Sequence, residues 1–446
     1  MPDSPSNHAV GAPPPDRLVR PLSPEERSIL ELENATVAGH TCKVIVLAER
    51  IDPDGLRETI ASRLHRAPEL RLRLDEVDGV PWWTPDPEFD LAAHVVVCDP
   101  GQTPDDAGLR ATVTRLFEQR LDRGRALWRM DVIPELAGGG SAVIWRLHHA
   151  LADGWTAMRM GHAVLWDEGP DDGVSSGRSR GSARGLGASA ATAGERAGVL
   201  LTAAREAPQP WRSSPFDGDI CAQRAVAFAS VELDGLRRVS ARVDGATVND
   251  AVLSVVGGGL RRWLEAHHGH LGAVRVKVPV SLHGGPAGRD AGAGEPGNRD
   301  SFFCLDLPLE SADPLTRLAA IRHATRVRKQ GHDAQHVDAL MRELGRASPR
   351  LRRFAEHVLA HPRSFALNVS NVPGPARPVH LAGIPVRALH AVAEIGERHA
   401  LRVAVVSFAD SLDFGLCADP TLVPDVDEMA DHMQAEAGRL LAEMRH

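Results

Sequence analysis

The residues best suited to chemistry lie in the stretch RLHHALADGWTAM, residues 146–158, where two adjacent histidines precede an Asp-Gly pair. The segment before them, SAVIWRL from Ser141, has the β-branched and aromatic residues of a strand. Because side chains alternate across a strand, His148 and His149 should point to opposite faces and could not bind one metal ion together. No H-E-x-x-H motif accompanies them, so we expect no metal site.

The same alternation would leave one imidazole facing the protein interior and the other facing a cavity. Asp153 and Gly154 would then lie at the tight turn into the next helix. An imidazole that is held in one tautomer can act as a general base near neutral pH. The alternative is a surface histidine pair before a polar turn, which is the usual meaning of a bare HH pair.

Charge and cysteine content exclude several classes of protein. The net charge of −8 argues against a general nucleic-acid-binding protein, which would carry a basic domain. The five cysteines are odd in number, widely spaced and without a CxxC motif, which is typical of reduced thiols in a cytoplasmic protein. The N-terminus lacks a signal peptide pattern, and no apolar window is long enough for a membrane span.

The length of 446 residues predicts two domains. The polar, Pro-rich residues 1–18 should be disordered, and Gly, Ser and Ala dominate residues 169–194. We therefore expect a first domain at 19–168, an interdomain linker at 169–210 and a second domain at 211–446.

Several elements can be predicted from their patterns. Ser23 and Pro24 should begin a short helix, an amphipathic helix should run from Asp52 through Leu70, and Thr247 or Asn249 should cap a longer one. Strands are expected at CKVIVLA, SAVIWRL, VRVKVPVSL, SFFCLDLPL, SFALNVSNV and LRVAVVSFADSLDFGLCAD, with a final helix through VDEMADHMQAEAGRLLAEM. The alternation of helices and strands indicates a mixed α/β protein.

HHALADG resembles the HHxxxDG signature of the chloramphenicol acetyltransferase-like superfamily, and the other matches fit the bacterial wax ester synthase/diacylglycerol acyltransferase family. RPLSPEERSILELENAT is similar to its opening PLSPxDxxFLxxE segment, and LDRGRALWRMDVI to its LDRxRPLW block, with Ala126 in place of the proline. The other similar segments are PWWTPDPEFDLAAHV, TVNDAVLSVVGGGLRRWL, VPVSLHGG with GNRDSFF, NVSNVPGPARPVHLAGIPV and LDFGLCADPTLVPD.

The resemblance implies a fold of two chloramphenicol acetyltransferase-like α/β domains, each a mixed, mainly antiparallel sheet flanked by helices, with a central channel. It implies an acyltransferase that uses acyl-CoA as co-substrate, without a bound cofactor, and that acylates a long-chain alcohol or diacylglycerol. Wax ester or triacylglycerol would be the product, and peripheral association with a membrane or lipid droplets would follow. Two alternatives remain open: acylation of a polyketide, sugar or amine from CoA or a carrier protein, and a non-catalytic binding protein.

The resemblance also implies roles for the motif residues. His149 matches the histidine that takes the proton from the acceptor alcohol. His148 should be mainly structural, and Asp153 should lie in a buried ion pair with an arginine or, alternatively, relay a proton. Gly154 would allow a close approach of the backbone to its surroundings.

In the second half, the resemblance marks five residues as candidate substrate contacts. Asn249 and Asp250 would hold the two halves together at the site, unless they are only helix caps. Asn298, Ser370 and Asn371 would contact the substrate, and one of them could donate a hydrogen bond to an oxyanion. The run RLAAIRHATRVRK, with Arg317, Arg322, Arg326, Arg328 and Lys329, could contact CoA phosphates or a membrane, or be a solvated helix face.

Overall fold

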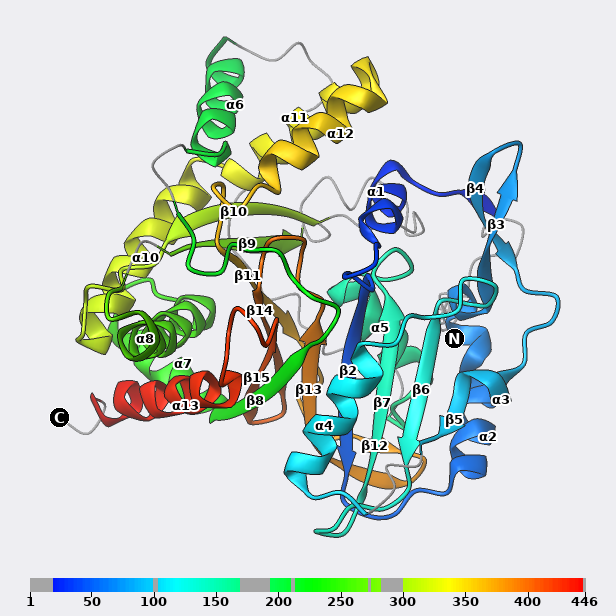
Figure 1. The fold of residues 1–446 in the computed structure, drawn as a ribbon. Coiled ribbons are helices and arrows are strands. Elements are labelled where there is room, and N and C mark those ends of the chain that lie inside the picture. Colours follow the sequence, from blue (N-terminus) through cyan, green and yellow to red (C-terminus); the bar gives the residue numbers. More distant parts are fainter. Residues whose placement is uncertain are drawn as a thin grey trace, which may run out of the picture.

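Two sheet-rich halves lie side by side in the computed structural model (Figure 1). The structure describes residues 19–98, 103–168, 193–209, 213–271, 274–281 and 300–443. The N-terminal segment 1–18, most of the predicted linker and Asn298 lie outside the described residues. The predicted domain boundaries therefore stay a prediction, although helix α6 (Ala193–Glu206) falls within the predicted linker.

The first half contains a short three-stranded sheet and most of a six-stranded one. Its elements, in chain order, are β1 (Arg20–Pro21), α1 (Pro24–Leu32), β2 (His40–Leu47), α2 (Pro53–Arg63), β3 (Leu72–Val77), β4 (Val80–Pro85), α3 (Leu91–His94), β5 (Val95–Val97), α4 (Asp106–Phe117), β6 (Trp128–Ile133), β7 (Ser141–His148) and α5 (Gly154–Val164). The large sheet has the order β12-β13-β2-β7-β6-β5, so β7 is central.

Two strands of that sheet come from the second half of the chain. They are β12 (His380–Leu381) and β13 (Ile384–Ala393), and β13 pairs antiparallel with β2. In the second half, β13 also crosses closely over β15 (Ser411–Ala418), where a β-carbon on Gly415 would collide with the carbonyl oxygen of Ala391. The β12–β13 hairpin therefore joins the two halves.

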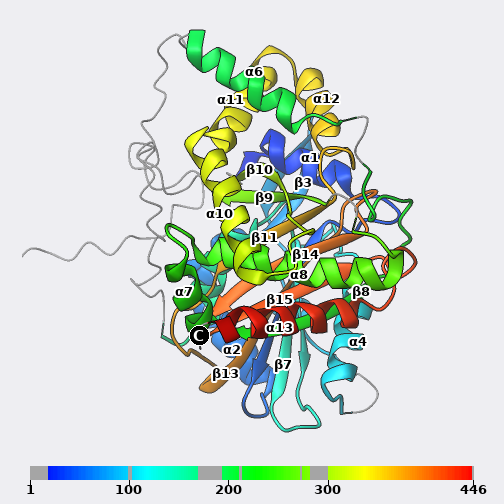
Figure 2. The same cartoon turned by 90° about the vertical axis from the view of Figure 1, so that its left-hand side faces the viewer.

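The second half contains another six-stranded sheet, with the order β10-β9-β11-β14-β15-β8. The remaining strands and helices are β8 (Ala225–Glu232), α7 (Leu233–Arg242), α8 (Val248–His268), β9 (Arg275–Ser281), β10 (Asp300–Asp306), α10 (Pro314–Gln330), α11 (Asp333–Ala347), α12 (Pro349–Leu359), β11 (Leu367–Pro373), β14 (Leu401–Phe408) and α13 (Val426–Ala442). Strand β11 is parallel to both β9 and β14. Figure 2 shows α8 and α13 across one face of this sheet, with α6, α11 and α12 beyond its end.

Alternate residues of β14 point into two different hydrophobic clusters. Val403 and Val405 pack with α7, α8 and α13, whereas Ala404 and Val406 belong to the cluster of the first half, with α2 and α5. One face of the second sheet is therefore turned toward the first half. Period-two alternation in a sheet buried on both sides explains why both sets are apolar.

Local sequence signals account for most helix starts. Ser23 caps α1 as predicted, and of the two predicted caps for α8 the structure has Thr247 and not Asn249. Each cap belongs to a capping box, with Glu26 and Asp250 respectively. The predicted helix from Asp52 is shorter than expected, because α2 ends at Arg63 and two 3₁₀ turns follow. Pro68 explains the difference, since proline lacks a backbone N–H and disfavours helical geometry in the preceding residue.

The basic run on α10 does not form a uniform charged face. Arg317 is fully buried and forms an ion pair with Glu436 of α13, and its Nε donates to the carbonyl oxygen of Ser254 at 3.1 Å. Arg328 pairs with Asp333 at 3.0 Å. The expectation that the whole run could contact a ligand is therefore wrong for Arg317, which stabilises the interior of the second half.

Candidate acyl-transfer site

The two motif histidines lie at the end of β7, between β2 and β6. The backbone N–H of His148 donates to the carbonyl oxygen of Leu127, and that of His149 donates to the carbonyl oxygen of Gly39, both at 2.9 Å. The backbone of the motif is thus held on both sides by the residues that directly precede β6 and β2. Hydrogen bonds on both sides fix the directions in which the two imidazoles leave the sheet.

His148 is engaged in structural contacts. Its side chain is 2% exposed, its Nδ1 accepts a hydrogen bond from the N–H of Ala150 at 3.1 Å, and its Nε2 lies 3.3 Å from Oε2 of Glu33. Because Nδ1 accepts, Nε2 is the ring nitrogen that donates a proton to Glu33. His148 therefore has no ring nitrogen left for an acceptor alcohol.

Glu33 is the site residue that sequence reasoning missed. Its carboxylate accepts hydrogen bonds from Arg123 at 2.6 and 3.0 Å as well as from His148. Burial raises the pKa of Glu33, but the hydrogen bonds of His148 and Arg123 and the positive charge of Arg123 outweigh burial and lower it to about 2. The signal was present, since Glu33 is the final glutamate of the PLSPxDxxFLxxE-like segment.

His149 is partly accessible and lies among positive charges. Burial lowers its pKa to about 3, and the charges of Arg402 and, to a lesser extent, Lys43 act in the same direction. Lys43 lies on β2 and is itself buried, and burial together with Arg402 lowers its pKa to about 8. The imidazole of His149 is therefore neutral at physiological pH and can accept a proton.

Asp153 begins helix α5 as its N-cap. The carboxylate is 1% exposed, and Oδ1 accepts a hydrogen bond from the backbone N–H of Thr156 at 2.6 Å. An acidic N-cap also interacts favourably with the helix dipole. This contact gives Asp153 a structural role at the turn, and the expected arginine partner stays a prediction.

Gly154 brings the motif against the second half of the chain. A β-carbon at this position would lie 2.8 Å from Cγ2 of Val372 in β11. Val372 belongs to the SNVPGP segment, so the two motifs, more than 200 residues apart, contact each other. Only a residue without a β-carbon allows this close approach.

Strand alternation separates the two candidate contacts on β11. Asn368 lies opposite Arg402 of β14 and Lys277 of β9, and Ser370 lies opposite Ala404. Residues that are paired across neighbouring strands share a face, so Ser370 shares its face with Arg402 and Val372. Asn371 lies on the opposite face, with the buried Val369.

The Asn249-Asp250 pair lies in the first turn of α8. Oδ2 of Asp250 accepts from the N–H and the hydroxyl of Thr247, both at 2.8 Å, and Oδ1 accepts from the hydroxyl of Thr325 at 2.7 Å. These three hydrogen bonds lie within the second half. They stabilise the start of α8, and the expected contacts of Asn249 and Asp250 with substrate stay predictions.

Among the described residues, one group of histidine and carboxylate side chains has ligand atoms close together, at His267, Asp425 and Glu428. This group lies where α8 ends and α13 begins, and it contains neither motif histidine. Within the described part of the chain, no helix is both long and apolar enough to span a membrane.

Comparison with known proteins places this geometry in a family. Residues 22–181 match the model of the wax ester synthase/diacylglycerol acyltransferase catalytic domain, and residues 296–440 match the C-terminal domain of the same family. A Mycobacterium tuberculosis (strain H37Rv) protein named "Probable diacyglycerol O-acyltransferase tgs1" is 30% identical over 417 residues, which cover 88% of each chain.

Two solved structures share the fold. The wax ester synthase/diacylglycerol acyltransferase from Marinobacter aquaeolei VT8 matches with a TM-score of 0.68 and 22% identity, over 96% of this chain and 100% of that one. The starter condensation domain of rhizomide synthetase matches with a TM-score of 0.54 and 16% identity, over 94% and 95% of the two chains. The chain therefore belongs to the wax ester synthase/diacylglycerol acyltransferase family and is an acyltransferase with two chloramphenicol acetyltransferase-like halves.

Proposed function

We propose that the protein transfers a fatty acyl group from acyl-CoA to the hydroxyl group of a long-chain alcohol or diacylglycerol, with His149 as the general base. The observation that carries the proposal is the position of His149, which directly follows the central strand β7, is partly accessible and precedes the turn where Gly154 meets Val372 of the second half. A neutral hydroxyl group attacks a thioester poorly, and a positioned base typically accelerates such a step by about 10²- to 10⁴-fold.

The reaction is a direct transfer. The imidazole of His149 takes the proton of the acceptor hydroxyl while its oxygen forms a bond with the thioester carbonyl carbon. The tetrahedral intermediate then collapses, the carbon–sulfur bond breaks, and the CoA thiolate leaves with the proton from His149. This sequence needs no metal ion and no covalent acyl-enzyme.

The low pKa of His149 describes the protein before substrate charge develops. Negative charge forms on the carbonyl oxygen and on the leaving sulfur during the reaction. That charge stabilises the imidazolium of His149 and is itself stabilised by Arg402 and Lys43, whose charges also act on His149. The ring therefore becomes a stronger base as the reaction proceeds.

The roles of the other site residues follow from their positions. Ser370 is proposed to donate to the oxyanion, since it shares a face of β11 with Arg402. His148 and Asp153 are positioning residues, because their hydrogen bonds go to Glu33, Ala150 and the start of α5. A substrate contact by Asn298 remains part of the proposal on the strength of the family resemblance.

Measured products test the proposed acceptors. Incubation of the protein with palmitoyl-CoA and either hexadecanol or dipalmitoylglycerol should yield hexadecyl palmitate or tripalmitoylglycerol, identified by mass spectrometry. Ester formation should match the release of free CoA thiol mole for mole. Thiol release with short-chain or amine acceptors, and none with these two lipids, would contradict the proposed acceptors and favour specialised metabolism.

Association with a lipid surface is the second part of the proposal. Helices α6 and α12 both pack against α11, and they expose Leu200 (69%), Leu201 (60%), Leu351 (50%) and Phe354 (67%). Arg350 and Arg353 lie beside the last two on α12. Exposed apolar side chains next to basic ones are typical of helices that bind the interface of an anionic membrane.

Vesicle sedimentation tests this surface. The protein should sediment with vesicles that contain phosphatidylglycerol, and the double variant Leu351→Ser/Phe354→Ser should remain largely in the supernatant. Val97→Ser removes an exposed apolar side chain of β5 and should sediment like wild type. Equal sedimentation of all three proteins would show that α12 is not the lipid contact.

A further inference from the structure

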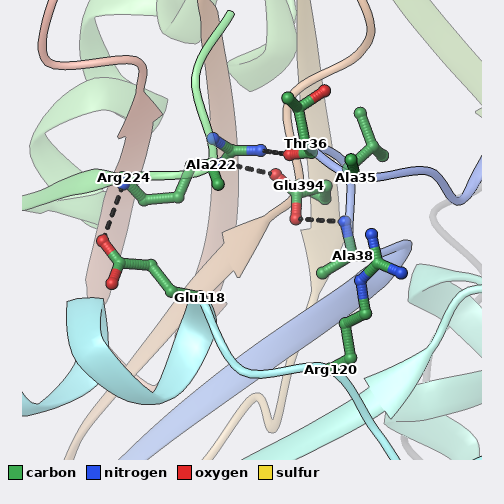
Figure 3. A pocket seen from close by; sticks show the side chains of 9 residues that line it. Ala35, Thr36, Ala38, Glu118, Arg120, Ala222, Arg224 and Glu394 are labelled. Carbon is green, nitrogen blue, oxygen red and sulfur yellow. Dashed lines mark hydrogen bonds and ion pairs between the residues drawn. The ribbon is translucent and has the colours of Figure 1, made fainter.

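A buried ion pair between Arg224 and Glu394 lies where the two halves of the chain meet (Figure 3). We propose that this pair positions His148 and His149 for catalysis by holding the chain segment 36–40. The proposal rests on the proposed function, because it takes His149 as the base. It makes Arg224 and Glu394 positioning residues, which act on the reaction through other groups.

Arg224 donates hydrogen bonds to carbonyl groups of two segments that are far apart in the sequence. Its Nε donates to Oε1 of Glu394 at 2.7 Å, and a terminal nitrogen donates to the carbonyl oxygens of Cys221 and Gln223 at 2.7 Å. The other terminal nitrogen donates to the carbonyl oxygen of Thr36. The guanidinium, 2% exposed as a side chain, thus ties the start of β8 to the segment that precedes β2.

Glu394 holds the same segment from the other side. Its Oε2 accepts from the backbone N–H of Ala38 at 3.2 Å, and its own backbone N–H donates to the carbonyl oxygen of His40 at 3.3 Å. The carbonyl oxygen of Glu394 also accepts from the guanidinium of Arg402 at 3.0 Å. Arg402 is the cation with the largest charge effect on His149.

Gly39 transmits these contacts to the two histidines. It lies between Ala38 and His40, and its carbonyl oxygen accepts the backbone hydrogen bond of His149 at 2.9 Å. Its φ of +70° places its Cα against His148, where a β-carbon would lie 2.9 Å from Nε2. A shift of the segment 36–40 would therefore move the backbone of His149 and the ring contact of His148 together.

The pocket around Arg224 and Glu394 is small, so the arrangement should be sensitive to the loss of either charge. It measures about 20 Å³ and is lined by Thr36, Ala38, Glu118, Arg224 and Glu394, among others. That volume is enough for about one water molecule. Removing either charge would leave its partner buried without a counter-ion, and water or a shift of the segment would have to compensate.

Two variants of the pair and two controls test the proposal. Arg224→Met removes the guanidinium, and Glu394→Gln removes the charge while keeping the size of the side chain. Arg224→Lys is the conservative variant. Glu436→Gln makes the same substitution in another buried ion pair, that of Arg317, on α13 at the far face of the second sheet.

We expect Arg224→Met and Glu394→Gln to lower kcat by about 10- to 100-fold with KM for palmitoyl-CoA changed less than about two-fold, since small misplacements can cost that much. The acid limb of kcat/KM should move to higher pH, because Arg402 is released from its position. Arg224→Lys should recover part of the lost kcat. Glu436→Gln should lose thermal stability and keep the wild-type kcat and acid limb.

A purely structural role would give a different pattern, with kcat per folded protein and the acid limb at wild-type values in every variant. That result would overturn the proposal. If Arg224→Met does not fold, the kcat and acid limb of Glu394→Gln decide between the two roles. His149→Ala is measured alongside. An active His149→Ala would overturn both this proposal and the assignment of the base. An inactive His149→Ala, together with wild-type kcat and acid limb in the Arg224 and Glu394 variants, would overturn the positioning proposal alone.

Discussion

Gly154 and Val372 lie so close that a β-carbon on the glycine would be 2.8 Å from Cγ2 of the valine. This contact joins the turn that follows the histidines to strand β11 of the second half. Real β-carbons essentially never approach another heavy atom so closely. The turn and β11 therefore cannot keep their separation if residue 154 gains a side chain.

Gly154→Ala should consequently push α5 away from β11 and lower kcat by about 10-fold or more, because the active-site geometry is set across this contact. Gly161→Ala in the same helix is the matched control, since its β-carbon would make an ordinary contact of 3.4 Å with Trp145. The double variant Gly154→Ala/Val372→Ala removes the obstructing methyl groups and should regain activity. A double variant no better than Gly154→Ala would contradict the contact as the cause.

The pKa of His149 sets the acid limb of the pH profile. A base must be deprotonated, so a pKa of about 3 in place of the ordinary value near 6.5 moves the loss of activity to lower pH. We expect kcat/KM to stay flat from pH 7, where Lys43 is still largely protonated, down to about pH 5. Lys43→Met removes one of the charges that lower this pKa and should move the limb upward.

Re-assay at pH 7.5 after incubation at low pH separates titration from unfolding in that profile. A wild-type acid limb near pH 6.5 would show that the surroundings of His149 do not lower its pKa in the working enzyme.

His40 should make the fold sensitive to acid. It is fully buried, and burial, followed by the charge of Arg146, lowers its pKa to about 3. Because the unfolded chain takes up this proton below about pH 6.5 and the folded chain does not, stability is lost as the pH falls from 6.5 toward 3. One such group accounts for about 2 kcal/mol between pH 7 and pH 5.

Urea unfolding at pH 7 and pH 5 measures that loss. Between pH 7 and pH 5, the free energy of unfolding of His40→Leu should fall by about 2 kcal/mol less than that of wild type. This difference should hold whatever the stability of the variant at pH 7. His65→Leu replaces an exposed histidine and should match the wild-type difference. An equal difference in all three proteins would show that His40 does not titrate abnormally.

Ser370 and Asn371 give a test in neighbouring residues. Ser370 shares its face with Arg402, whereas Asn371 lies on the other face of β11. Loss of one oxyanion donor typically costs about 10²- to 10³-fold in kcat, so Ser370→Ala should fall within or near that range. Asn371→Ala should have a clearly smaller effect on kcat. The reverse order would show that the oxyanion is stabilised from elsewhere.

The local parts of this structure could be predicted from sequence. Apolar alternation indicates the strands at SAVIWRL and SFALNVSNV, and Ser23 and Thr247 predict the starts of the helices that they cap. These signals act over a few residues, where hydrogen-bond chemistry and periodicity are visible in the chain itself. The α2 helix shows the limit, because the effect of Pro68 outweighs the amphipathic pattern.

The contacts that complete the site were not predictable in this way. Glu33 meets His148 across 115 positions, and Gly154 meets Val372 across a still longer separation. Strand β13 joins the first sheet from the second half, and the residue pattern of β13 does not predict its pairing with β2. Such pairings depend on how whole sheets stack, which a single sequence does not encode in any short segment.

The most direct test of His149 as the base is acceptor-dependent release of CoA thiol from palmitoyl-CoA by wild type, His149→Ala and the exposed-surface control His65→Ala. With hexadecanol present, we predict that His149→Ala releases thiol about 10²- to 10⁴-fold more slowly than wild type while remaining folded, and that His65→Ala matches wild type. Equal rates for wild type and a folded His149→Ala would contradict the assignment, because the proton of the alcohol would then be taken by another group.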